Sequence, residues 1–196
     1  MKTIGIIGAG HIAQAVAGHL LKNNIPVLIS NSRGIESLEP VISKLGKGAK
    51  AATTEQAAAA EIVILALPWW EVKNLSGLTD WKGKIVIDIT NEFLPGGKIA
   101  DLGEKTASGI VLEQLAGARL VKAFNTLYAT ILVADPLIGQ GRRIVFVAGD
   151  DDGAKAEIVE LIGRLGFAPV DLGTLAAGSR LIEAKGVFSG TNLLKL

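Results

Sequence analysis

Residues 3–16, Thr-Ile-Gly-Ile-Ile-Gly-Ala-Gly-His-Ile-Ala-Gln-Ala-Val, combine an apolar strand, a glycine-rich turn and the first turns of a helix. Gly8, Gly10 and Ala13 fit the pattern G-x-G-x-x-G/A of dinucleotide-binding turns. Gly8 permits the sharp turn, Gly10 lets a pyrophosphate approach the backbone, and Ala13 lets the helix pack against the strand. Unpaired N–H groups at the start of the helix would face the negative charge of the ligand. The stretch therefore predicts a dinucleotide site, and a glycine-rich turn without a ligand is the alternative.

The rest of the chain continues the alternation of strands and helices. We expect strands at 3–7, 26–30, 49–51, 62–67, 84–89, 120–123, 144–148 and 168–172, and helices at 11–22, 36–45, 54–60, 107–117, 126–132, 152–165 and 174–185. Thr54 is expected to cap the helix that it begins. The alternation predicts an α/β fold with a doubly wound, Rossmann-like, mostly parallel sheet. We expect a single domain over residues 1–196, with a core of about 1–125 and a C-terminal strand–helix extension of about 126–196.

Composition narrows the class of protein. The chain is 49% hydrophobic, as buried parallel strands require, but its longest apolar run is nine residues, 62–70. A membrane span needs about 20, so we expect no transmembrane segment and a cytoplasmic protein. The net charge of +1 does not indicate a nucleic-acid surface. With no cysteine, disulfides and thiolate catalysis are excluded. The expected partners are small-molecule cofactors, and a homodimer is a possible assembly for so apolar a chain.

The end of the second strand indicates which dinucleotide is bound. In NAD-binding forms, an Asp or Glu about 20 residues after the turn accepts hydrogen bonds from the ribose 2′-OH. This chain has no Asp or Glu before Glu36, and its second strand ends in Ser30-Asn31-Ser32-Arg33. The hydroxyl of Ser32 and the guanidinium of Arg33 suit a 2′-phosphate. We therefore predict NADP rather than NAD, the alternative being that Arg33 is a solvated surface charge.

Several motifs along the chain occur together in one known family. They are Gly8-Ala9-Gly10-His11-Ile12, Ser32-Arg33, Ala66-Leu67-Pro68-Trp69, Asn125-Thr126-Leu127-Tyr128-Ala129, Gly149-Asp150-Asp151 and Gly178-Ser179-Arg180-Leu181-Ile182-Glu183. With them the chain resembles the coenzyme F420-dependent NADP oxidoreductases. The resemblance implies direct hydride transfer between the nicotinamide C4 and the deazaflavin C5 of F420. It also implies roles by position: Ala9, Gly10, His11 and Ile12 at the pyrophosphate, Ser32 and Arg33 at the 2′-phosphate, Leu67, Pro68 and Trp69 along the middle of the cofactor, and Leu127 and Ala129 near the nicotinamide.

Residues 88–93 are more similar to bacterial members of the superfamily. These include relatives of the STEAP reductase domain and of the N-terminal domain of pyrroline-5-carboxylate reductase. The acceptor implied by the resemblance is therefore F420, a flavin or another molecule.

Ligands of an open α/β sheet bind beyond the carboxyl ends of its strands. The nicotinamide is therefore expected along residues 67–68, 90–91 and 125–129, with Asn91 or nearby backbone bonded to its carboxamide. Hydride exchange between two cofactors requires no strong protein acid, and no catalytic acid or base is predicted. Tyr128 could donate a proton or only pack against the ring. His11 could contact the pyrophosphate or face solvent.

Two other clusters have structural interpretations. Asp150, Asp151 and Asp152 precede a helix and are expected to cap it rather than to bind a metal, and no metal site is predicted. Of the adjacent Trp69 and Trp70, Trp69 is the one expected to stack on a planar cofactor. His19 is expected to be a structural residue of the first helix.

Three functions follow from these patterns. The first is an NADP-dependent oxidoreductase that passes hydride to a deazaflavin or flavin-like acceptor. The second is a small imine or carbonyl reductase. The third is a non-catalytic module that binds NADP(H), because binding motifs alone do not establish turnover.

Overall fold

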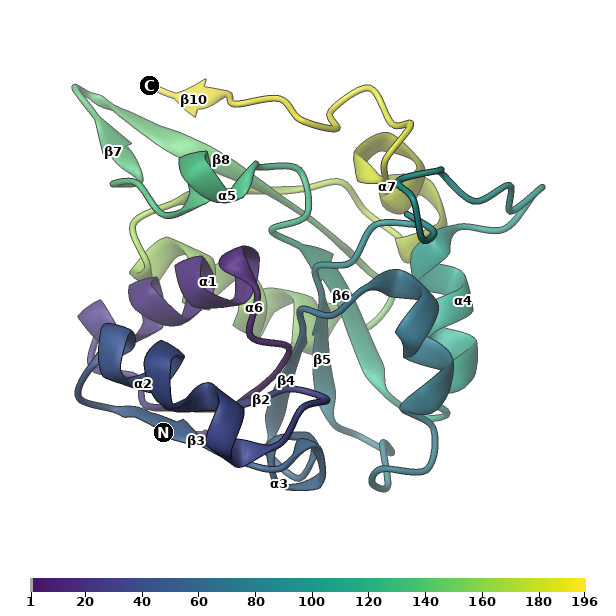
Figure 1. Ribbon diagram of the computed structural model, residues 1–196. Coiled ribbons are helices and arrows are strands. Elements are labelled where there is room, and N and C mark those ends of the chain that lie inside the picture. Colours follow the sequence, from purple (N-terminus) through teal and green to yellow (C-terminus); the bar gives the residue numbers. More distant parts are fainter. Residues whose placement is uncertain (1) are drawn as a thin grey trace.

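The computed structural model describes residues 2–196 as one open sheet with helices on both faces (Figure 1). The strands are β1 (Ile4–Ile7), β2 (Val27–Ser30), β3 (Ala49–Ala51), β4 (Ile62–Leu65), β5 (Ile85–Asp88), β6 (Arg119–Ala123), β7 (Leu137–Ile138), β8 (Gly141–Gly149), β9 (Ala168–Asp171) and β10 (Leu194–Lys195). The helices are α1 (His11–Lys22), α2 (Glu39–Leu45), α3 (Thr54–Ala58), α4 (Ala107–Gln114), α5 (Ala129–Leu132), α6 (Asp152–Arg164) and α7 (Leu175–Ile182), with the 3-10 helices η1 (Ile35–Leu38) and η2 (Trp69–Asn74).

The sheet has the predicted doubly wound order. Strands β3, β2, β1, β4, β5 and β6 lie side by side in that order, and every neighbouring pair among them is parallel. The chain winds outward in one direction from β1 to β3, then returns past β1 to β4 and continues the other way. The order therefore reverses between β1 and β4, and such a switch point opens a crevice at the carboxyl ends of the strands. The glycine-rich turn lies at that crevice because it follows β1.

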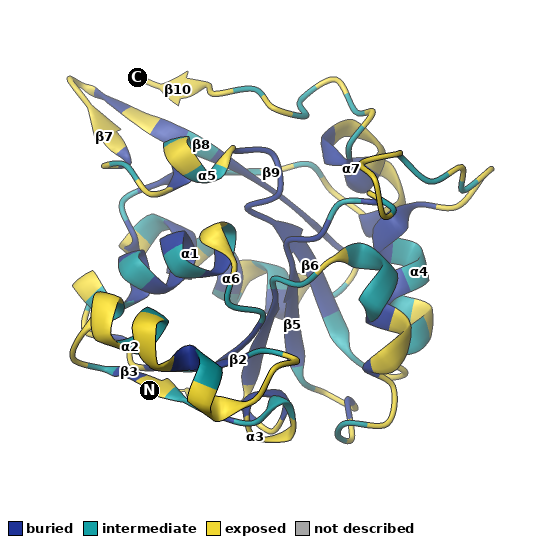
Figure 2. Ribbon diagram, in the orientation of Figure 1, coloured by how far each residue is buried: buried dark blue, intermediate teal, exposed yellow. Residues whose placement is uncertain are grey.

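Alternation along the strands divides the apolar side chains between two cores. Ile4 and Ile6 of β1 belong to a core beneath α1, α2 and α6, whereas Ile7 belongs to a second core beneath α3, η2, α4 and α7. Figure 2 shows the central strands almost wholly buried. The high apolar content is thus accounted for by two covered sheet faces. Within residues 2–196, no helix combines the length and apolar character that crossing a bilayer requires.

Some element ends differ from the sequence predictions for local reasons. The cap of α3 is Thr53, not Thr54: the Thr53 hydroxyl accepts a hydrogen bond from the Gln56 N–H (3.2 Å), and the Gln56 side chain accepts one from the Thr53 N–H (2.9 Å). This reciprocal pair is a capping box. The helix expected at 126–132 begins only at Ala129, because its N-cap Tyr128 is still extended, with φ −63° and ψ 149°.

The C-terminal part departs further from the prediction. Strand β8 runs antiparallel to β6, as a mostly parallel sheet allows but no sequence pattern specified, and β9 then pairs with β8 in parallel. Two short strands were not predicted at all. These are β7 and β10, which pair antiparallel with the first residues of β8 and form the arm at the top of Figure 1.

Candidate functional site

The glycine corner after β1 has the geometry that the motif requires. Gly8 has φ +122°, and a Cβ there would lie 2.0 Å from the carbonyl oxygen of Ala66, the residue that follows β4. Gly10 is the N-cap of α1, and a Cβ there would meet nothing within 4 Å. No side chain caps α1, and its first turn contains no acidic residue. The open space at Gly10 and the uncapped N-terminus together fit a pyrophosphate.

A first cavity of about 520 Å³ opens on one side of this corner. Its lining includes seven of the predicted site residues, Gly8, Ala9, Gly10, Ser32, Arg33, Leu67 and Pro68. The loop that carries Ser32 is shaped by Asn31, whose Oδ1 accepts a hydrogen bond from the Arg33 N–H at 2.9 Å. Across residues 2–196, the Arg33 guanidinium makes neither a hydrogen bond nor an ion pair. It is therefore available to a phosphate.

Two carboxylates that were not predicted at the site also line the first cavity. Glu55 comes from the first turn of α3 and Glu71 from η2. Hydrogen bonds from its own backbone N–H and from the Thr53 hydroxyl lower the pKa of Glu55, so this carboxylate remains ionised. Because α3 follows β3 at the same sheet edge as the glycine corner, the topology could have suggested Glu55. Among the described residues that line this cavity, Arg33 is the only lysine or arginine.

A second cavity of about 460 Å³ lies on the other side of the corner and shares Gly10 and Ala66 with the first. Its lining includes the predicted residues Gly10, His11, Ile12, Asn91, Leu127 and Ala129. Phe93, Ser189 and Gly190 also line it and were not predicted. The last two come from the chain that follows α7, far from the motif in sequence. The predicted site residues thus gather in two connected halves, joined at the corner.

The loops after β5 and β6 are tied together by two amide side chains at the second cavity. The Asn91 Nδ2 donates to the backbone oxygen of Asn125 at 3.0 Å, and the Asn125 Nδ2 donates to the Asn91 Oδ1 at 3.0 Å and to the Ile182 oxygen at 2.7 Å. The amide of Asn91 is therefore engaged with the protein. The Oδ1 of Asn125 is buried and has no hydrogen-bond partner in residues 2–196, so the lining of this cavity retains an unmet acceptor.

A buried ion pair supports the same loops. Lys122 of β6 donates from Nζ to the Asp88 Oδ2 at 3.0 Å and also to the Thr90 backbone oxygen, and both charged side chains are fully buried. Asp88 also accepts hydrogen bonds from the Thr90 N–H (2.8 Å), the Thr90 hydroxyl (2.7 Å) and the Ser108 hydroxyl (2.7 Å). This network fixes Thr90 and hence the direction of Asn91. From sequence, Lys122 was expected only as a strand residue, and Asp88 as a strand residue that also begins the segment 88–93.

The aromatic candidates differ in their positions. Trp69 lines neither cavity, because its indole N–H donates to the Ala107 oxygen at 3.2 Å and its ring packs beside α4. Tyr128 lines the second cavity and is 70% exposed. A Cβ on Gly190 would lie 3.3 Å from the Tyr128 hydroxyl, so this hydroxyl rests against the chain that follows α7. Of the two, only Tyr128 adjoins the cavity.

Of the acidic cluster, only Asp151 caps the helix that follows it as predicted; Asp150 bonds to the first residue of α7, and Asp152 is the first residue of α6. The Asp151 Oδ1 accepts from the Ala154 N–H and from the Arg119 guanidinium, both at 2.7 Å, and Asp150 accepts from the Leu175 N–H at 2.8 Å. The hydrogen bond from Arg119 lowers the pKa of Asp151 to about 2. In residues 2–196, His, Asp and Glu side chains nowhere form a group of three suited to a metal.

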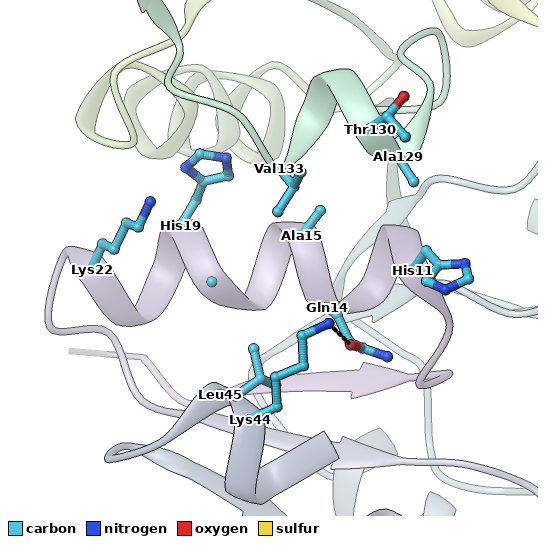
Figure 3. Close-up of a pocket in the computed structure, with 11 residues that line it drawn as sticks. His11, Gln14, Ala15, His19, Lys22, Lys44, Leu45, Ala129, Thr130 and Val133 are labelled. Atoms are coloured by element: carbon cyan, nitrogen blue, oxygen red, sulfur yellow. Dashed lines mark hydrogen bonds between the residues drawn. The ribbon is translucent and has the colours of Figure 1, made fainter. Parts of the chain in front are cut away.

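A groove of about 380 Å³ runs along α1, on the side that faces α2 and α5 (Figure 3). It is lined by His11, Gln14, Ala15, Gly18, His19, Lys22, Lys44, Leu45, Ala129, Thr130 and Val133. His19 is a structural residue, as predicted: it is buried, and its Nε2 lies 2.6 Å from the Leu132 oxygen. Burial lowers the pKa of His19, so its imidazole is neutral at pH 7 and donates this hydrogen bond from Nε2.

Comparison with known proteins agrees with this geometry. Residues 3–92 match the family model described as NADP oxidoreductase, coenzyme F420-dependent. A hypothetical protein of Sinorhizobium meliloti, SMa0349, has a crystal structure that is 43% identical with a TM-score of 0.95, covering 100% of this chain and 97% of that one. A putative F420-dependent NADP-reductase of Arthrobacter sp. FB24 is 25% identical with a TM-score of 0.78, covering 89% and 86% of the two chains.

Curated relatives are longer proteins. Metalloreductase STEAP3 of Rattus norvegicus is 28% identical over 184 residues, which are 92% of this chain and 36% of the relative. The chain thus spans about a third of the length of the curated relatives that it matches. The glycine corner and the second strand both lie within the residues that match the family model. Residues 3–92 therefore match the family of coenzyme F420-dependent NADP oxidoreductases, and the similarity to SMa0349 extends over the whole chain.

Proposed function

We propose that this protein binds NADP(H) across the glycine corner and exchanges a hydride between it and a deazaflavin or flavin-like acceptor. The observation that carries the proposal is the pair of cavities that meet at Gly10 and Ala66. Their volumes, about 520 and 460 Å³, are each within the range of small-ligand sites. Two such halves on either side of a dinucleotide turn suit a molecule with an adenosine end and a nicotinamide end.

The first cavity is proposed to hold the adenosine half. The Ser32 hydroxyl and the Arg33 guanidinium would bind the 2′-phosphate, and the backbone from Ala9 to Ile12 would bind the pyrophosphate. Leu67 and Pro68 would line the middle of the cofactor. NADP is proposed over NAD because the Arg33 guanidinium has no partner within the described chain and because the carboxylates of the cavity, Glu55 and Glu71, come from α3 and η2 and not from the end of β2.

The second cavity is proposed to hold the nicotinamide. Its lining contains no carboxylate, lysine or arginine, and it combines apolar side chains such as Ile89 and Leu127 with the amides of Asn91 and Asn125. Bound NADPH supplies the hydride from its nicotinamide ring. The contribution of the protein is then to hold that ring against the loops after β4, β5 and β6 and to exclude water from it.

One assay compares the proposed function with the alternatives. The purified protein is mixed with NADPH or NADH, and absorbance is followed with F420, FMN, FAD, a cyclic imine, a ketone or no acceptor. We expect oxidation of NADPH with a deazaflavin or a flavin, and slower oxidation of NADH. Turnover restricted to the imine or ketone would instead identify a small-substrate reductase. Binding of NADPH without turnover of any acceptor would identify a non-catalytic module.

A further inference from the structure

The groove along α1 begins where the second cavity ends. His11 and Ala129 line both, so the two spaces adjoin at the N-terminal end of the helix. The groove extends from His11 to Lys22, and in Figure 3 these side chains lie at opposite ends of α1. At 1.5 Å per helical residue the distance is roughly 16 Å. The groove shares no lining residue with the first cavity. A ligand in the groove would therefore leave the proposed adenosine site free.

The groove is cationic at its rim and apolar along its floor. Lys22 and Lys44 line it, and no Asp or Glu does. In the part of the chain that the structure describes, neither lysine forms an ion pair, and the Lys44 Nζ donates to the neutral Oε1 of Gln14 at 3.2 Å. Asp135 is close enough to affect His19 beneath the groove, but it does not line the groove. The rim thus carries positive charge that the protein does not neutralise.

A glycine on the floor keeps the groove open. Gly18 faces it from the middle of α1, and a Cβ there would meet nothing within 4 Å. Ala15 and Val133 supply apolar surface on either side. A glycine in a helix interior is less stable there than alanine. The open floor, the apolar walls and the cationic rim together fit an elongated ligand that carries an anionic group.

We propose that this groove binds the phosphorylated side chain of the hydride acceptor while the acceptor's ring lies at the second cavity. The inference rests on the proposed function and names the acceptor's class: a flavin or deazaflavin with a phosphate on its side chain. Lys44, whose Nζ is bonded to Gln14 near the His11 end, supplies the charge that such a phosphate needs, and Lys22 adds positive charge at the far end of the groove (Figure 3). The shared residues His11 and Ala129 make the groove continuous with the place where the ring meets the nicotinamide.

The test compares acceptors that differ only in the phosphorylated side chain. FMN is paired with riboflavin, and F420 with the same deazaflavin lacking its phosphorylated tail. Dissociation constants are measured by quenching of the acceptor's fluorescence without NADP, and KM values are measured with NADPH. The test variant is the pair Lys22→Gln and Lys44→Gln. Its matched control is the pair Lys47→Gln and Lys50→Gln, which removes two exposed lysines outside the groove.

Wild-type protein is expected to bind the phosphorylated partner of each pair more tightly, by about tenfold for two partly solvated charges. The groove variant should lose that preference, whereas the control pair should keep it. Gly18→Leu should weaken the binding of both acceptors of each pair, because its side chain fills the floor of the groove. Its far-ultraviolet circular dichroism should be unchanged. The preference should also shrink as salt is added.

Two results would overturn the inference. One is equal affinity of the wild-type protein for both members of each pair. The other is a preference that survives in the Lys22 and Lys44 variant. Failure of the proposed function gives a different result, namely no binding of NADP to the wild-type protein or no reduction of any flavin or deazaflavin. The fluorescence measurement without NADP reports on the groove in either case.

Discussion

Replacing Gly8 and replacing Gly10 by alanine should have different consequences, the first for folding and the second for ligand binding. At Gly8 the backbone is left-handed, with φ +122°, and a Cβ would lie 2.0 Å from the Ala66 oxygen. At Gly10 the backbone is extended, with φ −73° and ψ −177°, and a Cβ would project into open space that both cavities share. We therefore expect Gly8→Ala to damage the fold and Gly10→Ala to damage only ligand binding.

The geometry sets the size of each effect. Gly8→Ala combines a strained φ with an overlap against backbone, each worth about 1–3 kcal/mol, so the free energy of unfolding should fall by about 2–6 kcal/mol. Gly10→Ala introduces no strain, but its methyl group holds the pyrophosphate away from the N–H groups of α1. Loss of one charge-assisted hydrogen bond, about 1.5–3 kcal/mol, raises the Kd for NADP by about ten- to hundredfold.

The assay pairs urea denaturation with calorimetric titration of NADP. The control is Gly163→Ala in α6, where a Cβ meets nothing and alanine should stabilise the helix by about 0.5–1 kcal/mol. That control should bind NADP as the wild type does. The reasoning would be refuted if Gly10→Ala bound NADP with wild-type affinity, or if Gly8→Ala were as stable as the wild type.

Three further predictions concern charged or titratable groups. Arg33→Ala should weaken the binding of NADP by about tenfold and leave the binding of NAD unchanged. The measurement is the ratio of the two Kd values, and an unchanged ratio would contradict the 2′-phosphate assignment. Lys122→Met should lower the free energy of unfolding by about 3–5 kcal/mol in urea, because it strands a buried carboxylate, whereas Lys105→Met breaks an exposed pair and should cost under about 1 kcal/mol. Equal costs would show that burial of the first pair has no energetic consequence. Because burial lowers the pKa of His19 below its ordinary value of 6.5, the unfolded chain binds an extra proton just under that pH. Stability should therefore fall as pH drops below 6.5, by at most about 1.4 kcal/mol per pH unit, and the fall should shrink in His19→Leu but persist in His11→Gln.

The elements that could be predicted from sequence are those whose signal is local. The first helix was predicted at residues 11–22 and the short strand at 49–51, and both agree with the structure. In each, an apolar pattern is bounded by glycine or asparagine within a few residues. The glycine corner was predictable for the same reason. Each of its three small residues is required by a steric constraint that arises within a few residues of it.

The direction of β8 could not be read in this way. Its core residues, Ile144 to Ala148, have the same continuous apolar pattern as a buried parallel strand. What reverses it is its pairing with β6, in which Val121 faces Gly149 and Ala123 faces Val147. Strand direction depends on how the intervening segment crosses the sheet, and that segment contains only the four-residue helix α5 and the two-residue strand β7. No helix long enough for a parallel crossover lies between β6 and β8.

The same limit explains the missed site residues. Ser189 and Gly190 reach the second cavity because the chain after α7 returns across the sheet, and Glu55 reaches the first because α3 begins at the glycine corner's edge. Neither stretch carries a motif. Their position at the cavities follows from the topology of the sheet. A sequence motif within one segment therefore cannot predict it.

The two halves of the site differ in how far the protein prepares them for a ligand. Around the second cavity, the buried pair of Asp88 and Lys122 and the amide pair of Asn91 and Asn125 fix the loops before any ligand arrives. In the first cavity, the guanidinium of Arg33 is exposed and has no partner among residues 2–196. A side chain that must be ordered on binding subtracts its own entropy from the affinity that it provides. In the proposed binding mode, the desolvation cost of burying Lys122 is therefore borne beside the nicotinamide, which must be held in place, and the unpaired Arg33 lies at the adenosine end, which only needs to be recognised.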